Sequence, residues 1–92
     1  MARRRRSRLR ILVDILQSIE RESGVRITQI LYSANLPYDR LVRYLNELKE
    51  KGLIKEVREE GAVKYFLTKK GFEFLSEFRR IERFAEAFGI EL

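Results

Sequence analysis

The sequence contains no cysteine, no histidine and no tryptophan. Without cysteine there is no disulfide framework and no thiol nucleophile, and without histidine the commonest acid–base group and zinc ligand is missing. The only aspartates, Asp14 and Asp39, belong to no paired-carboxylate motif, and the five glycines are isolated turn or cap residues. We therefore expect no enzyme activity, no metal, no cofactor and no small-molecule ligand.

Long hydrophobic runs are also absent. The apolar stretches span only a few residues, so no membrane-spanning segment is expected. The apolar residues 11–13 are interrupted by Asp14, and no cleavage site follows them, so we expect no signal peptide. A chain of 92 residues is expected to form one domain, and the predicted location is the cytoplasm, in association with the nucleoid.

Arginine is present in excess, and its placement is uneven. The net charge is +6, and residues 1–10 hold six arginines and no acid, so the other 14 basic residues balance the 14 acidic ones. An arginine run attracts phosphate backbones, although a merely solubilising tail is the alternative. Arginine outnumbers lysine 14 to 6, and such charge-rich compositions are typical of thermophilic proteins.

Apolar spacing predicts three helices in the first half of the chain. The first is capped by Ser7 and stops at Gly24, and the second covers residues 26–34. The third begins beside Pro37 and ends at Gly52. Its leucines at 41, 45 and 48 share one face.

The second half predicts a hairpin and a last helix. Residues 53–59 and 62–67 alternate and are rich in β-formers, and Glu60-Gly61 separates them. Thr68 then caps a helix that runs to about residue 88. The predicted fold is mainly α with a small β-hairpin (α+β), a winged helix-turn-helix. It comprises a basic arm (1–6), a winged-helix domain (7–71) and a C-terminal helix (72–92).

The last helix has two apolar faces. Phe72 and Leu75 suit a face packed on the domain, and a second stripe recurs at alternating spacings of four and three residues. A second copy of the chain is the economical cover for it, which predicts a homodimer; the alternative is that the helix folds back on its own domain. The predicted dimer interface comprises Phe74, Phe78, Ile81, Phe84, Ala85 and Phe88.

Candidate DNA contacts follow from the same arrangement. Arg40 and Arg43 lie in the first turns of the third helix, the end that enters a major groove. Arginine can pair with guanine or hold a phosphate, and Asn46 can pair with adenine, although a solvated helix residue is the plainer interpretation. The residues predicted to contact double-stranded DNA are Arg3, Arg4, Arg5, Arg6, Arg8, Arg26, Thr28, Gln29, Tyr38, Arg40, Arg43, Asn46, Arg58 and Lys64.

Three segments carry a family resemblance: YSANL (32–36), YDRLVRYLNELKEKGLI (38–54) and YFLTKKGFEFL (65–75). In this order and spacing they resemble the winged helix-turn-helix domains of small archaeal DNA-binding proteins, above all the ten-kilodalton chromatin proteins of the "ten-a" type and related regulators. The resemblance implies a dimer joined through its C-terminal helices that binds duplex DNA with modest sequence preference. This chain departs from that family in a shorter last helix and an acidic wing tip at Glu59-Glu60.

Two functions from different classes follow. The first is a DNA-binding protein, either a transcription regulator or a chromatin-associated protein. The second is a winged helix that docks other proteins through its aromatic last helix. The arginine-rich arm favours the first because it calls for a polyanion, and RNA binding by the same surface is a third, weaker possibility.

Overall fold

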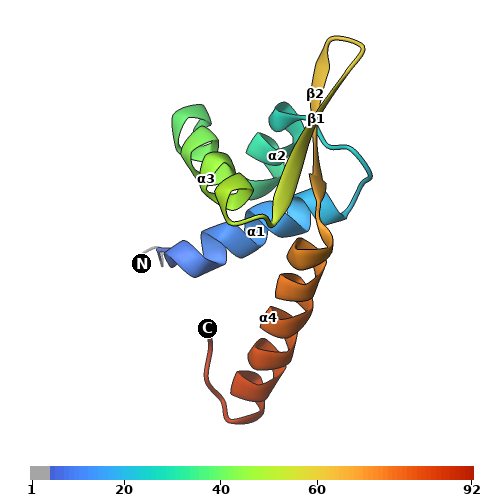
Figure 1. Cartoon of the computed structure of the whole chain (residues 1–92). Helices are drawn as coiled ribbons and strands as arrows, with labels where there is room; N and C mark the ends of the chain where they lie inside the picture. Colours follow the sequence, from blue (N-terminus) through green and yellow to red (C-terminus); the bar gives the residue numbers. More distant parts are fainter. Residues whose placement is uncertain (1–4) are drawn as a thin grey trace.

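The protein, seen in a computed structural model that describes residues 5–92, has four helices and one antiparallel hairpin in that range (Figure 1). The elements are α1 (Arg8–Glu20), α2 (Ile27–Ala34), α3 (Tyr38–Glu50), β1 (Ile54–Glu59), β2 (Ala62–Leu67) and α4 (Lys69–Ala87). This order confirms the predicted winged helix-turn-helix fold. Within the described range, no helix has both the length and the apolar character that a membrane span requires.

The helix α1 begins as its sequence predicts. The Ser7 Oγ accepts a hydrogen bond from the backbone N–H of Arg10 at 3.0 Å, which satisfies one of the unpaired donors of the first turn. One face of α1 is fully buried, and Ile15, Leu16 and Ile19 are among its largest buried side chains. The helices α2 and α4 and the strand β2 pack against α1.

The predicted end of this helix at Gly24 was wrong, because α1 stops at Glu20. The connection that follows contains Gly24 with φ of +80°, and it brings Val25 to the sheet. There Val25 and Tyr65 exchange both backbone hydrogen bonds, at 3.1 and 2.8 Å. The chain leaves the helix early because this short bridge to β2 needs extended backbone.

The turn between α2 and α3 has the residues it requires. Asn35 adopts a left-handed conformation with φ of 54°, which asparagine tolerates better than most residues, and Leu36 is buried beneath the turn. Pro37 is the N-cap of α3, where its missing N–H leaves no bond unmade. The apolar face of α3 is buried through Leu41, Leu45 and Leu48.

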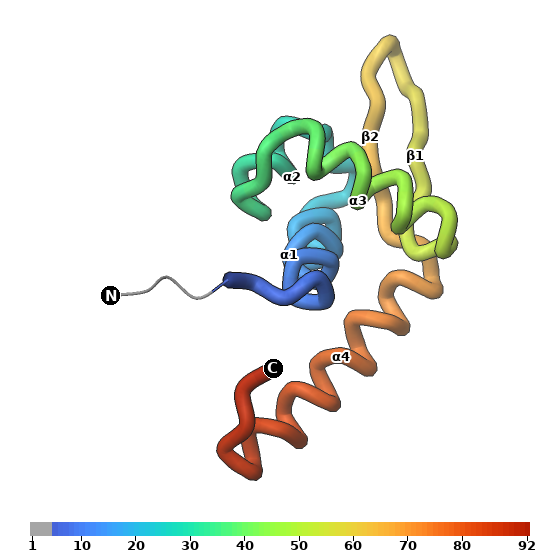
Figure 2. Tube along the Cα trace, turned by 90° about the vertical axis from the view of Figure 1, so that its left-hand side faces the viewer, coloured from blue at the N-terminus to red at the C-terminus, as the bar shows by residue number. Residues whose placement is uncertain are grey.

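The hairpin forms the wing. Its strands pair from Ile54↔Leu67 to Glu59↔Ala62, and both residues of the loop, Glu60 and Gly61, have positive φ. Such a loop matches the right-handed twist of the strands. Figure 2 shows the hairpin standing out from the helices, with its tip far from α4.

The start of α4 packs tightly under the hairpin. Thr68 caps the helix by accepting from the Gly71 N–H at 3.1 Å and donates to the carbonyl of Gly52 at 2.6 Å. A Cβ placed on Gly71 would lie 2.1 Å from the carbonyl oxygen of Leu53, so only glycine fits there. Gly71 therefore lies inside a helix at a close backbone approach, contrary to the expectation that every glycine is a turn or cap residue.

The rest of α4 extends away from α3 and the hairpin, on the opposite side of α1 (Figures 1 and 2). Two ion pairs join it to α1: Arg79 to Glu20, with N–O distances of 3.1 and 2.6 Å, and Arg10 to Glu82 at 2.6 Å. The helix ends in the predicted capping motif, in which the N–H of Ile90 donates to the carbonyl of Ala85 at 2.9 Å.

Candidate nucleic-acid interface

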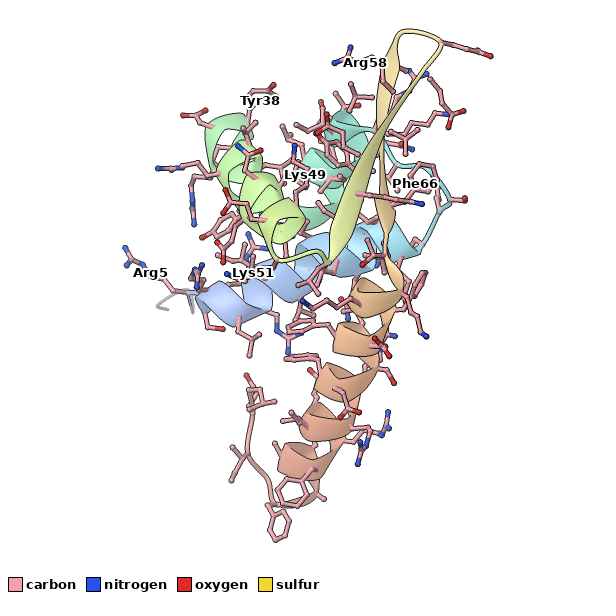
Figure 3. All side chains as sticks on the ribbon, viewed as in Figure 1. Arg5, Tyr38, Lys49, Lys51, Arg58 and Phe66 are labelled. Atoms are coloured by element: carbon pink, nitrogen blue, oxygen red, sulfur yellow. The ribbon has the colours of Figure 1, made fainter. Side chains whose placement is uncertain are left out.

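The outer face of α3 is polar and open to solvent. Arg40, Arg43, Asn46 and Glu50 are all exposed, on the sides of the helix away from its buried leucines. Tyr38 is 58% exposed at the start of the helix, where Figure 3 shows it on the free end of α3. The predicted recognition residues of α3 are therefore all accessible to a partner.

The carboxylate of Glu47 on this helix is paired with cations. It is bound by the guanidinium of Arg8 on α1 and lies 3.6 Å from the ammonium of Lys51. Together with Arg40, Arg43 and the half-buried Tyr44, Glu47 lines a shallow depression of about 320 Å³ on the flank of α3. Because cations compensate Glu47, this flank repels a phosphate less than the sequence alone suggests.

The arginine arm meets the helix-turn-helix. Arg3 and Arg4 lie outside the described residues. Arg5 is exposed, and with Arg6, Arg8 and Arg40 it lines a second depression of about 430 Å³ between the start of α1 and α3. Figure 3 shows Arg5 beside the start of α1.

Arg6 has a structural task that the sequence did not reveal. Its guanidinium donates to the Asp14 carboxylate at 3.0 Å and to the carbonyls of Ala34 and Asn35 at 2.6 and 3.0 Å. Those carbonyls belong to the end of α2, which otherwise leaves them without helical partners. Arg6, predicted as an arm residue, thus ties α1 to the turn before α3. Arg6 and Arg8, both predicted to contact DNA, thus also have partners within the chain.

The start of α2 offers fewer free groups than predicted. The Gln29 Oε1 accepts from the backbone N–H of Arg26 at 2.9 Å, and its Nε2 donates to Glu22 at 3.3 Å. Gln29 is therefore a capping residue. Arg26 and Thr28 are exposed at the same helix end, and their side chains are accessible to a phosphate.

The two wing candidates lie on opposite faces of the hairpin. Arg58 pairs with Val63 and Lys64 pairs with Val57, and neighbouring pairs along a ladder alternate between faces. Arg58 shares its face with Glu56, which binds Lys49 of α3 at 2.8 Å, so Arg58 lies on the α3 side. The hairpin therefore presents Arg58, and not Lys64, beside the recognition helix; Figure 3 shows Arg58 high on the wing.

Two groups at the contact between α3 and the wing have shifted pKa values. The hydrogen bond from Lys49 holds the pKa of the Glu56 carboxyl below its usual value. Burial, helped by the charge of Glu56, raises the pKa of the Tyr65 hydroxyl. Near neutral pH, Glu56 is therefore ionised and Tyr65 is neutral. The ion pair between Lys49 and Glu56 fixes the wing relative to α3.

The predicted DNA contacts did not include Tyr44, which lines both depressions. It lies four residues after Arg40, so helical spacing places both on one flank of α3, and this spacing could have identified Tyr44 from the sequence.

No group of three or more acidic side chains that could hold a metal occurs in the described part of the chain.

The predicted apolar stripe on α4 is covered in part. Phe78 is buried in the core of the single chain, and the guanidinium of Arg10 lies 5.1 Å from its ring centre. Ala85 is also buried, and Phe74 packs against the core. Ile81, Phe84 and Phe88 are 55%, 67% and 69% exposed, and the rings of the last two lie 5.1 Å apart. Phe72, expected on the packed face, was wrongly placed: it is 51% exposed.

Known proteins share this architecture. The family model for winged helix-turn-helix proteins matches residues 5–86. A similar solved structure is Sso10a-2, a DNA-binding protein from Sulfolobus solfataricus, with 25% identity and a TM-score of 0.78 over 90% of this chain and 85% of that one. No curated protein matches the sequence significantly. The archaeal resemblance stated from the sequence is confirmed.

Two further solved structures share the fold at lower identity. The transcriptional repressor CouR, solved on a 23-mer DNA duplex, is 19% identical, with a TM-score of 0.71 over 92% of this chain and 65% of the repressor. A MarR family protein from Bacillus stearothermophilus is 20% identical, with a TM-score of 0.70 over 83% of this chain and 56% of that one. This chain thus spans 65% and 56% of the length of these two proteins.

Proposed function

The chain belongs to the winged helix-turn-helix family, and we propose that it binds duplex DNA as a transcription regulator or chromatin-associated protein of the nucleoid. This proposal rests on one observation: basic residues of the arm, of α3 and of the wing lie on or beside the exposed face of α3. Arg40 and Arg43 lie on α3 itself, Arg5 lies at one flank, and Arg58 lies on the wing face that adjoins the other flank.

The relatives support DNA over the alternative of a protein-docking module. Sso10a-2 is described as a DNA-binding protein, and it is similar over most of its length. The Sulfolobus relative, with the charge-rich composition, supports an archaeal and thermophilic source.

The arrangement assigns separate tasks to the basic residues. In a helix-turn-helix, side chains from the first turns of the recognition helix reach base edges, while contacts to phosphates fix the register. Arg43 and Asn46 occupy the outward face and are suited to bases. Arg5 and Arg58 flank that face and are suited to phosphates, and Arg26, exposed at the start of α2, is a further phosphate candidate.

A titration of labelled duplex DNA by fluorescence anisotropy at several salt concentrations tests the proposal. We expect binding whose log K falls linearly with log salt, by roughly 0.9 per phosphate contact. Replacing Arg3, Arg4 and Arg5 by alanine should flatten that slope while Arg6 keeps its structural bonds. Absence of binding at low salt would contradict a DNA function. An unchanged slope in the arm variant would show that the arm contributes nothing.

We also propose that the protein is a homodimer joined through α4. Ile81, Phe84 and Phe88 form an exposed aromatic and aliphatic patch, of a kind that soluble monomers rarely leave in water. Two copies would cover it and would present two recognition helices to one duplex, which raises affinity through effective concentration. Light scattering should report about twice the 11.0 kDa chain mass at micromolar concentration. A mass of one chain would refute the dimer.

A further inference from the structure

The depression between the start of α1 and α3 collects four guanidinium groups from three parts of the chain. Arg5 and Arg6 come from the arm, Arg8 from the first turn of α1 and Arg40 from α3. Ile11 and Tyr44 complete its lining. Positive charges gathered in this way repel one another unless an anion lies among them.

The acids of the protein neutralise only part of this charge. Asp14 binds Arg6 at 3.0 Å, and Glu47 binds Arg8. Four guanidinium groups less two carboxylates leave a charge of +2 at the depression. Arg5 and Arg40 form no ion pair and no hydrogen bond with any described residue. Within this lining the surplus charge lies on Arg5 and Arg40. Arg5 also borders a neighbouring depression that Glu86 and Glu91 line.

The helix α1 adds to the positive potential. It has no acidic residue in its first turn, where an acid would be favoured by the helix dipole, and it places Arg8 and Arg10 there instead. Glu47 and Glu82 compensate these two cations through ion pairs from other helices, while the first turn of α1 itself carries no acid. An external anion at the depression would interact favourably with this helix end, and the arginine fork matches the oxygens of a phosphate.

The depression is continuous with the predicted recognition surface. It shares Arg40 and Tyr44 with the neighbouring depression that Arg43 and Glu47 line on the flank of α3. A nucleic-acid strand that leaves the outer face of α3 would pass directly over Arg40 toward Arg5.

We propose that this depression is a phosphate site, and that its occupant is one phosphodiester of the DNA backbone beside the groove that α3 enters. Arg5 and Arg40 hold the phosphate oxygens, while Arg6 and Arg8, fixed by Asp14 and Glu47, supply the positive surroundings. This inference rests on the proposed DNA function, and it assigns the arm a fixed contact rather than a diffuse attraction. The same chemistry would accept free inorganic phosphate.

The decisive variant replaces Arg5 and Arg40 by alanine together, since neither forms an ion pair or hydrogen bond with another residue of the range 5–92. The matched control replaces Arg21 and Arg83, which are exposed at the far end of α1 and on α4, and so removes the same charge. On duplex DNA of random sequence, we expect the salt slope of the site variant to fall by about 1 relative to the control, the contribution of one phosphate. Equal slopes for the two variants would overturn the assignment to the DNA backbone.

A second measurement separates the two sources of phosphate. Inorganic phosphate is titrated against chloride at constant ionic strength while backbone amide shifts are followed by NMR. Saturable shifts at Arg8 and Arg40 that vanish in the site variant but persist in the control support a phosphate site. If they occur without a change in the DNA salt slope, the occupant is free phosphate and the DNA assignment is wrong. If neither response occurs, the depression is not a phosphate site.

A wild-type protein that fails to bind any duplex would instead refute the proposed function and the DNA assignment together. The phosphate titration would still decide whether the site exists. A wild-type protein that binds DNA while the site variant and control behave alike would refute only the site.

Discussion

Helices α3 and α4 are both amphipathic, yet only α3 buries its whole apolar face within one chain. In α3, Leu41, Leu45 and Leu48 are all enclosed, and the opposite face carries charged and polar groups. In α4, Leu75 and Phe78 are enclosed, while the stripe continues into Ile81, Phe84 and Phe88, each more than half exposed.

This difference separates two kinds of surface. The outer face of α3 is polar, so it gains little from apolar burial and is suited to a solvated, charged partner. The second half of α4 presents aromatic rings that gain free energy when they leave water. A polyanion and a second protein chain are therefore expected on different sides of α1, where neither obstructs the other (Figure 1).

The largest expected effect lies on the buried face of α3. Leu45→Ala removes a side chain that is 2% exposed, and we expect a loss of about 2–5 kcal/mol in the free energy of unfolding, because a cavity remains. Asn46→Ala, one residue further on the exposed face, is the control and should change stability by less than about 0.5 kcal/mol. Urea denaturation at a fixed protein concentration measures both. Similar losses for the two variants would contradict the described orientation of α3.

The exposed stripe of α4 should behave in the opposite way. Phe84→Ala removes a ring that a partner would bury, and we expect dimer dissociation to become easier by about 1.5–3 kcal/mol. Phe78 does not provide this test, since it lies in the core and its loss would unfold the chain. Sedimentation at a series of concentrations gives the dissociation constant, with Arg83→Ala on the opposite face of α4 as control. A dissociation constant that Phe84→Ala leaves unchanged would remove this residue from the interface.

Local pattern was enough to predict most of the fold. The leucine spacing of α3, the Glu60-Gly61 loop and the capping residues Ser7 and Thr68 each act within a few residues of sequence, so the chain itself reveals them. The end of α1 was not predictable in that way. It depends on the bridge from Val25 to Tyr65, which joins residues far apart in the chain.

The roles of charged residues were harder to predict for the same reason. Arg6 looks like part of a continuous basic run, but its partners at Asp14, Ala34 and Asn35 come together only when the domain has folded. Lys64 looked equivalent to Arg58 until the strand register placed them on opposite faces. Composition indicates how much charge a chain carries, whereas the fold decides which charges are already paired.

A smaller effect is expected on the outer face of α3. Arg43→Ala should weaken binding to a preferred duplex by about 1–3 kcal/mol if the side chain meets a base, and it should leave the stability of the protein unchanged because the residue is exposed. Anisotropy titrations against the preferred duplex and a scrambled one measure the difference. Equal losses on both would make Arg43 a phosphate contact, and no loss on either would exclude this face of α3 from the interface.

The smallest expected effect concerns the ion pair that holds α4 to α1. Arg79 donates two hydrogen bonds to the Glu20 carboxylate, at 3.1 and 2.6 Å, and these bonds hold the pKa of Glu20 below its usual value, while burial acts in the opposite direction. A carboxyl whose pKa is lowered by folding stabilises the folded state at pH values above its unfolded pKa, which is about 4.3. That stabilisation is lost as pH falls through the lower folded value.

Glu20→Gln should therefore reduce the free energy of unfolding at pH 7 by about 0.2–1 kcal/mol, because both side chains are partly exposed and water screens the pair. The difference from wild type should stay constant down to about pH 5 and shrink at lower pH. Glu77→Gln is the control, since Glu77 pairs with Arg80, one turn along the same helix. Urea denaturation at pH 7 and at pH 3 provides the measurement. A deficit that persists undiminished at pH 3 would show that the glutamate acts through packing rather than through its charge, and α4 would then be held to α1 by its apolar contacts alone.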